Sequence, residues 1–365
     1  MLPLRELRRR PSRFAVATVV LAFLATLLMF LGGLLDGLFL GSTGAIRAQQ
    51  ADAIVFSADA RDSFLRSRID ADLRAEVDDI AAVGESGGLG FVLLGAVVPG
   101  ADELADVAVA GYELPPAGLP EPPADGTGVA DDRLRDAGVE VGDVILVGPA
   151  ASPIEIVGFV NDTAYLLQST VWVNLPTWRS VQNANRPDAA VSDSVVQALV
   201  VRGRDGATVE PAAIDLATGE ATRSLTVDAA VYALPGVEQQ ESTFNQIIYS
   251  TLVVVLSVVG LFFSLLTIER LSLYGVLKAI GASDRRLFAG VVLQAVVVTV
   301  VAFGAGSLLA VLAAVALPDG VPLQLTGGRF VSTFVGLLVA SVLGSAISLR
   351  RLTRVDPASA IGTGS

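Results

Sequence analysis

One uncharged apolar segment near the N-terminus is followed by a long acidic stretch and then by three more apolar segments. The four apolar segments run from Phe14 to Leu35, Ile247 to Ile268, Leu287 to Leu317 and Phe330 to Leu349. Each is close to or longer than the roughly 20 residues that an α-helix needs to cross a bilayer. This order predicts an α-helical membrane protein with four transmembrane helices and one large domain inserted between helices 1 and 2.

The distribution of charge predicts the orientation of these helices. Most basic residues outside the acidic stretch gather in three places: residues 1–13 hold five Arg, the connection after the second apolar segment holds Arg270, Lys278, Arg285 and Arg286, and the tail holds Arg350, Arg351 and Arg354. Basic loops stay in the cytoplasm. Residues 45–243 hold 31 acidic and 12 basic residues, a net charge of −19. We therefore expect both termini inside the cell and the acidic domain outside.

A cleaved signal peptide is the alternative interpretation of the first apolar segment. That segment follows a basic stretch, but it exceeds the roughly 7 to 15 residues of a signal-peptide core, and no small-x-small site closes it before Asp36. We interpret it as a retained anchor. The predicted localisation is the cytoplasmic membrane, with several crossings.

Composition excludes several kinds of chemistry. The chain has no Cys and no His, which rules out disulfides, a catalytic thiol, a Ser-His-Asp triad and the common zinc sites. The adjacent acids Asp78-Asp79 and Asp131-Asp132 are typical of a solvated surface, and the usual general base is missing. The sequence predicts no catalytic residue and no metal site.

The inserted domain is expected to be α+β. Apolar runs typical of strands lie at 53–58, 90–98, 107–112, 144–147, 154–160, 170–173, 195–201 and 229–234, and helices are expected at 63–82 and 131–137. A Pro-rich loop covers 114–128. The predicted boundaries along the chain are a basic segment at 1–13, the first span with its outer extension at 14–44, the external domain at 45–243, the other spans at 244–349 and a cytoplasmic tail at 350–365.

A short amphipathic helix is expected on the cytoplasmic side, at 271–283. Leu273, Val276, Leu277 and Ile280 form an apolar stripe at helical spacing, Gly281 can end the helix, and Ser283 can cap the next one. A plain re-entry loop between two spans can have the same pattern. Spacing alone does not separate the two interpretations.

The residues around this helix resemble a known family. The pattern ER-x-x-LYGVLKAIGAS-x-x-x-LF from Glu269 to Phe288, and the ending Arg354-Val355-Asp356-Pro357-Ala358, are similar to those of ABC-transporter permeases of the MacB/FtsX type. The order of one span, an external domain and three spans is also theirs. The stretch 158–174 looks more like the haem-exporting and DevC-like permeases than the macrolide-exporting branch.

The resemblance implies a permease subunit that works with a separate ABC ATPase. The chain has no G-x-x-x-x-G-K-[ST] motif, so it is not expected to bind the phosphates of ATP and Mg itself. In such permeases the cytoplasmic helix docks on the ATPase. The residues implied for that contact are Glu269, Arg270, Leu273, Val276, Leu277, Lys278, Ile280, Gly281 and Ser283.

A second permease copy is also implied, as a homodimer. Small residues that allow close helix approach lie in the first span (Gly32, Gly33), the second (Ser257, Gly260, Ser264) and the fourth (Gly336, Ala340, Gly344). These residues can serve the dimer or the chain's own bundle equally well.

The function expected from the resemblance is export of an amphiphile, with haem as the candidate substrate. Met29 and Tyr249 are expected at similar depth in the outer leaflet, and Tyr165 belongs to the haem-exporter-like stretch. In a chain without His or Cys, Met and Tyr are the remaining common haem ligands, although packing is the usual role of such residues in a span. The alternative is an FtsX/LolE-like protein that transmits motion to a cell-wall hydrolase or lipoprotein partner.

Overall fold

The computed structural model describes residues 11–100, 103–269, 283–318 and 321–350. The chain forms two compact units, which we call the helical unit (Met1–Gly37 with Gln240–Ser365) and the sheet domain (Leu38–Gln239). The sequence placed the corresponding limits of the domain at residues 45 and 243. The predicted helix at 271–283 lies outside the described residues except for Ser283.

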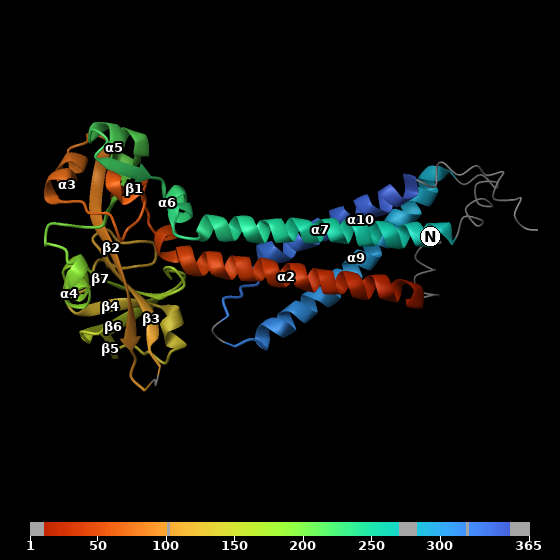
Figure 1. Cartoon of the computed structure of the whole chain (residues 1–365), viewed down its shortest axis with the longest axis horizontal. Helices are drawn as coiled ribbons and strands as arrows, with labels where there is room; N and C mark the ends of the chain where they lie inside the picture. The colour runs from red at the N-terminus through yellow and green to blue at the C-terminus, as the bar shows by residue number, and fades with distance from the viewer. Residues whose placement is uncertain (1–10, 101–102, 270–282, 319–320, 351–365) are drawn as a thin grey trace, which may run out of the picture. The chain divides into compact units, whose positions relative to one another are not determined.

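The helical unit is built from four long helices: α2 (Pro11–Arg47), α7 (Val237–Ile268), α9 (Asp284–Val315) and α10 (Gly327–Arg350) (Figure 1). In the described part of the chain, all four are long and apolar enough to cross a membrane. The expectation of four transmembrane helices is therefore confirmed. The first helix continues to Arg47, beyond the apolar segment that ends at Leu35, because no Pro interrupts residues 12–47.

The four helices share one apolar core. It contains buried residues from each helix, among them Leu21 and Ala25 of α2, Val259 of α7, Val298 of α9 and Leu337 of α10. Helix α9 begins after Ser283, which occupies the N-cap position but makes no capping hydrogen bond through its side chain. Ser283 therefore lies at the predicted capping position, but the predicted capping hydrogen bond is not formed.

The sheet domain holds nine strands, and six of them close into a ring. The strands are β1 (Ala53–Ser57), β2 (Val83–Val97), β3 (Ala105–Tyr112), β4 (Thr127–Asp131), β5 (Val144–Val147), β6 (Ser152–Val160), β7 (Ser169–Asn174), β8 (Ala198–Gly203) and β9 (Thr222–Leu225). Their order is β3-β7-β4-β6-β5-β2-β8-β1-β9, and an added pairing of β3 with β2 closes the first six into a barrel. The long β2 belongs to the barrel with its second half and carries β8 with its first half.

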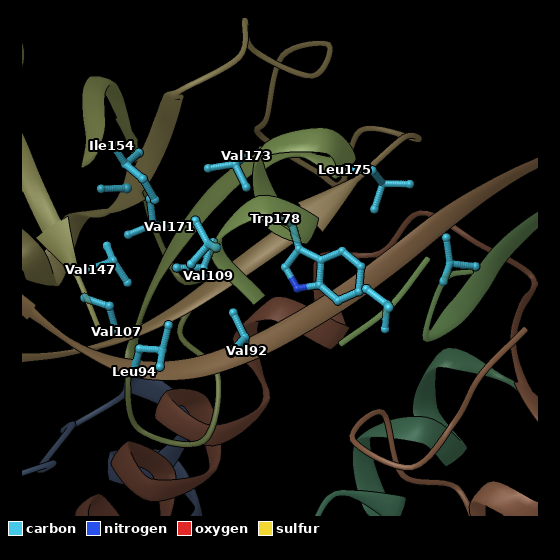
Figure 2. Packing of buried hydrophobic residues seen from close by; sticks show 14 of the residues in the cluster. Val92, Leu94, Val107, Val109, Val147, Ile154, Val171, Val173, Leu175 and Trp178 are labelled. Carbon is cyan, nitrogen blue, oxygen red and sulfur yellow. The ribbon is translucent and has the colours of Figure 1, made fainter. Parts of the chain in front are cut away.

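The barrel is filled by aliphatic side chains. Residues alternate between the two faces of a strand, so Val107 and Val109 of β3 meet Val171 and Val173 of β7 inside, as Figure 2 shows. Trp178 of α4 (Leu175–Asn185) joins this core, and Asn174 caps that helix by accepting from the Thr177 amide at 2.9 Å.

A second core lies on the other face of the sheet. Rings of Phe56, Phe64, Phe91, Tyr165 and Trp172 contact one another there. The last turns of α2 join this core through Ala45 and Ile46. Their backbone is held by the 162–167 loop, because the Ala45 amide donates to the Ala164 carbonyl at 3.1 Å and the Leu167 amide donates to the Gly41 carbonyl at 2.9 Å.

Strands mixed with short helices confirm the α+β class of the domain, but two predicted elements are wrong. The strand expected at 229–234 is helix α6 (Val227–Ala233), because Thr226 caps it by accepting from the Ala229 amide at 3.2 Å. The helix expected at 63–82 is only α3 (Ala71–Asp78), which starts where Asp70 caps the Leu73 amide at 2.9 Å. The sequence also missed β4, β9, α4 and α5 (Pro211–Ala217).

Candidate functional site

A cavity of about 430 Å³, open on one side, lies between helices α2 and α7 in the helical unit. It is lined by Leu24 and Leu27 of α2 and by Thr243, Gln246, Ile247, Ser250, Thr251 and Val254 of α7. All of these lining residues are uncharged, and the polar ones cluster toward the start of α7. An apolar wall beside hydroxyl and amide groups suits an amphiphile.

Neither predicted haem ligand of the helical unit lines this cavity. Met29 follows Leu27 by two residues, which is about 200° around a helix, and its side chain is fully buried. Tyr249 follows Ile247 by the same step and is 66% exposed. The structure therefore does not bring Met29 and Tyr249 together around the cavity.

Met29 lies on the face of α2 that carries its small residues. Ala22, Ala25, Gly32 and Gly33 are within about 60° of Met29 around the helix. This face packs on α9 and on the segment before α10. Burial on a packing face is the ordinary environment of a core methionine.

Tyr165 lies in the sheet domain and is buried in the aromatic core. Its ring stacks on Phe91 with centroids 4.2 Å apart, and 3% of the residue is exposed. Burial raises the pKa of the Tyr165 hydroxyl because the phenolate would lose its hydration. This environment disfavours the phenolate form that binds haem iron.

Most residues implied for ATPase docking lie outside the described residues. Arg270, Leu273, Val276, Leu277, Lys278, Ile280 and Gly281 belong to that set. Glu269 and Ser283, which flank residues 270–282 in the sequence, are described, and both are exposed. The docking contact stays a prediction.

The small residues of the spans are used within this chain. A Cβ on Gly344 of α10 would lie 2.7 Å from the Leu256 carbonyl oxygen and 3.1 Å from the Gly260 amide of α7. A Cβ on Gly33 would meet Leu325 at 2.8 Å. These close approaches support the interpretation that the small residues serve the chain's own bundle.

The adjacent acids of the sheet domain have structural contacts. Asp131 is buried and accepts from the amide of Thr163 at 2.8 Å and its hydroxyl at 2.9 Å, while Asp132 pairs with Arg135 at 2.5 Å. Two open hollows of about 610 and 630 Å³ lie on this domain. Within the described ranges, no group of three or more His, Cys, Asp or Glu is placed to hold a metal ion.

Sequence reasoning missed two polar features of the helical unit. The signals were Thr243, Gln246 and Ser250 at the start of an apolar helix, and single charges at the ends of two spans, Asp36 and Arg329. Arg329 lies at the start of α10, and its guanidinium Nε is 3.2 Å from the Asp36 carboxylate of α2. Spacing along one helix cannot reveal a partner on another.

Comparison with known proteins finds similarity to permeases. Residues 246–357 match the family described as FtsX-like permease C-terminal. The putative hemin transport system permease protein HrtB of Staphylococcus epidermidis is 22% identical over 243 residues, which cover 66% of this chain and 65% of that protein. The chain thus spans slightly less than two thirds of this relative. An uncharacterized ABC transporter permease of Mycobacterium bovis, Mb2592, is 26% identical over 98% of both chains.

Among solved structures, the periplasmic region of MacB from Actinobacillus actinomycetemcomitans matches with a TM-score of 0.34 and 12% identity, over 50% of this chain and 92% of that one. The similarity to an ABC permease extends along nearly the whole chain, and the family match covers α7, α9 and α10. In the described part of this chain, four helices are long and apolar enough to cross a membrane, and the sheet domain lies between the first and second of them in the sequence. Residues 246–357 thus match the FtsX-like permease family, and the chain as a whole is similar to ABC-transporter permeases.

Proposed function

We propose that the chain is the permease subunit of an ABC exporter that removes an amphiphile from the outer leaflet, with haem as the first candidate. A separate ATPase supplies the energy, and two permease copies form the working unit. The observation that carries the proposal is the uncharged cavity between α2 and α7. The similarity to proteins named for hemin transport supports haem as the first substrate to test.

The depth of the cavity suits a substrate that enters from lipid. Leu24 and Leu27 lie about 15 to 20 Å along α2 from Phe14, at a rise of 1.5 Å per residue. With the N-terminus in the cytoplasm, as the basic segment predicts, this places Leu24 near the middle of the bilayer and Leu27 in its outer half. The hydroxyl and amide groups of Thr243, Gln246 and Ser250 then lie nearer the outer surface.

Filling the cavity tests the proposal. Leu27→Trp and Ile247→Trp place an indole in the cavity, and Leu309→Trp is a matched control because Leu309 of α9 is 42% exposed, as Ile247 is. We expect the wild-type complex with its ATPase, in nanodiscs, to hydrolyse ATP faster when haemin is added. The two cavity variants should lose this stimulation, and the control should keep it.

Cells expressing the wild type or the Leu309→Trp control should tolerate haemin better than cells expressing either cavity variant. Equal stimulation in the wild type and both cavity variants would contradict the cavity as the substrate site. Absence of any haemin effect in the wild type would remove haem, and a neutral fluorescent phospholipid is then the next probe.

An FtsX-like coupler is the second candidate, and one feature of the sheet domain favours it. Val97, Val144, Leu146 and Val157 are each 39–48% exposed on the outer face of the neighbouring strands β2, β5 and β6. An exposed apolar sheet face is a common site of protein contact. ATP hydrolysis that responds to an extracytoplasmic protein and to no amphiphile would favour this function.

A further inference from the structure

A cluster of three polar residues joins α2 to the start of α10. The Arg329 guanidinium binds the Asp36 carboxylate through two nitrogens, with Nε 3.2 Å from Oδ2 and Nη2 in contact with Oδ1. The Thr326 hydroxyl donates to the same Oδ2 at 2.8 Å. The Arg329 and Asp36 side chains are only 18% and 20% exposed. A two-pronged ion pair of this kind has a fixed geometry.

Thr326 links this pair to the helix end itself. Its hydroxyl accepts from the Arg329 amide at 3.2 Å, so it caps the first turn of α10 while it donates to Asp36. The carboxylate of Asp36 therefore lies at the positive end of the α10 dipole. Movement of α10 away from α2 would leave a carboxylate and a guanidinium unpaired where water is scarce.

Glycines on α2 let the segment before α10 lie directly on the helix. A Cβ on Gly37 would lie 1.8 Å from the Pro322 carbonyl oxygen, and one on Gly32 would lie 2.3 Å from Cδ of Arg329. The Gln324 amide donates to the Gly33 carbonyl at 2.9 Å. Backbone thus packs on backbone along this side of α2.

A second contact holds α2 on α9, farther toward the N-terminus of α2. The Thr26 hydroxyl donates to the Gly306 carbonyl at 3.1 Å, and a Cβ on Gly306 would lie 2.6 Å from the Ala22 carbonyl oxygen. Helix α2 is therefore fixed to α9 and to the start of α10 at two levels.

The contact between α2 and α7 is different. It contains the 430 Å³ cavity, and near the other end of these helices Phe14 meets Phe262 with ring centroids 6.0 Å apart. Helix α7 is held closely to α10 at Gly260 and Gly344, about 20 Å along α7 from Ile247. At cavity level the Leu252 side chain of α7 faces Gly336 of α10, where an added Cβ would lie 3.3 Å from Cδ2 of Leu252.

We propose that Asp36, Thr326 and Arg329 form a clamp that keeps α2, α9 and α10 in one rigid group, so that the cavity opens by movement of the outer half of α7. The contact of Gly260 with Gly344 is the pivot. The clamp residues are positioning residues, and the proposal rests on the proposed transport function. Opening at α2–α7 separates uncharged groups, whereas opening at the clamp would separate a partly buried ion pair.

The absence of cysteine from the chain allows a direct test by cross-linking. Asp36→Cys with Arg329→Cys spans the clamp, and Leu27→Cys with Ile247→Cys spans the cavity. Each full-length pair is assembled with the ATPase in nanodiscs and bridged with a short bis-methanethiosulfonate reagent, with the single-cysteine variants as controls. We expect haemin-stimulated ATP hydrolysis to survive the bridge across the clamp. The bridge across the cavity should abolish it, and reductant should restore it.

Loss of activity on bridging the clamp, or normal activity with the cavity bridged, would overturn the proposal. A second measurement uses the permease alone and does not depend on transport. Arg329→Gln should lower the melting temperature, and Asp36→Asn added to it should recover part of the loss, because the unpaired carboxylate is removed. Additive losses would show that no clamp exists. If haemin does not stimulate ATP hydrolysis by the wild-type complex, but the melting temperatures of the Asp36 and Arg329 variants are not additive, haem is rejected as substrate and the clamp is retained.

Discussion

The rings of Phe91 and Tyr165 stack in the core of the sheet domain, with centroids 4.2 Å apart and planes 10° from parallel. This packing leaves the Tyr165 hydroxyl in a dry environment, which raises its pKa. Burial also raises the pKa of Tyr112 to about 12, with a further contribution from the negative charge of Glu121. Both residues therefore hold their protons more tightly in the folded state.

Alkaline pH should destabilise the sheet domain. The unfolded state loses tyrosine protons near pH ~10, whereas the folded state keeps them to higher pH, so the stability from these groups is complete below pH ~10 and falls as pH rises toward the folded pKa. We expect Tyr165→Phe to reduce this fall. The chain's two Trp, Trp172 and Trp178, both lie in this domain, so Trp fluorescence during thermal unfolding at pH 8 to 11 measures it. Tyr249→Phe, an exposed residue of α7, is the control; equal pH dependence in both variants would refute the prediction.

The crossing of α7 and α10 should not tolerate a side chain at Gly344. An added Cβ would lie 2.7 Å from the Leu256 carbonyl oxygen, and separating the two helices should cost about 1 to 3 kcal/mol. Gly304→Ala is the matched control, because a Cβ there meets nothing within 4 Å. Thermal unfolding of the purified protein in detergent should show a lower midpoint for Gly344→Ala only. Equal midpoints would mean that the crossing is looser than described.

Charge predicts the topology, and labelling can test it. Cysteines at Asp125 and Ser283 are both at exposed positions. In intact cells, an impermeant maleimide should react with the cysteine at Asp125 and not with that at Ser283, while permeabilised cells should label both. The reverse pattern in intact cells would contradict a cytoplasmic N-terminus.

The predicted helix at 271–283 should carry the ATPase contact. Leu277→Asp places a charge in an apolar contact, so we expect the ATPase to be lost from the purified complex while membrane insertion is unchanged. Ala279→Asp adds the same charge about 200° away around a helix and should keep the ATPase. Co-purification of the ATPase at normal yield with Leu277→Asp would show that docking lies elsewhere.

The haem-ligand prediction for Met29 and Tyr249 needs variants that preserve packing. Met29 is fully buried, so Met29→Ala could cost about 2 to 5 kcal/mol by leaving a cavity, whereas Met29→Leu keeps the volume. If these residues bind haem iron, Met29→Leu with Tyr249→Phe should shift the Soret band of the haemin-loaded protein without lowering its yield. An unchanged spectrum would remove both residues from the site.

The sequence alone determined the membrane topology class of this protein. Long apolar runs must be helical in lipid, because every backbone polar group there needs an internal partner, and this requirement is local to each run. Short apolar runs are a local signal too, and they predict the strands β1 at 53–57 and β5 at 144–147. Local pattern also predicts a strand where the short helix at 227–233 forms, because the cap at Thr226 outweighs the strand preference of its apolar residues.

Only the tertiary structure decided which side chains meet. Asp36 and Arg329 are separated by most of the chain, as are Leu27 and Ile247, and neither pair has a signature in spacing along a single helix. The buried position of Met29 follows from the small residues that share its face of α2, and that of Tyr165 from aromatic rings contributed by β1, β2 and β7. Helical periodicity shows which residues share a face, but the partner of that face depends on how distant segments pack, which no local pattern contains.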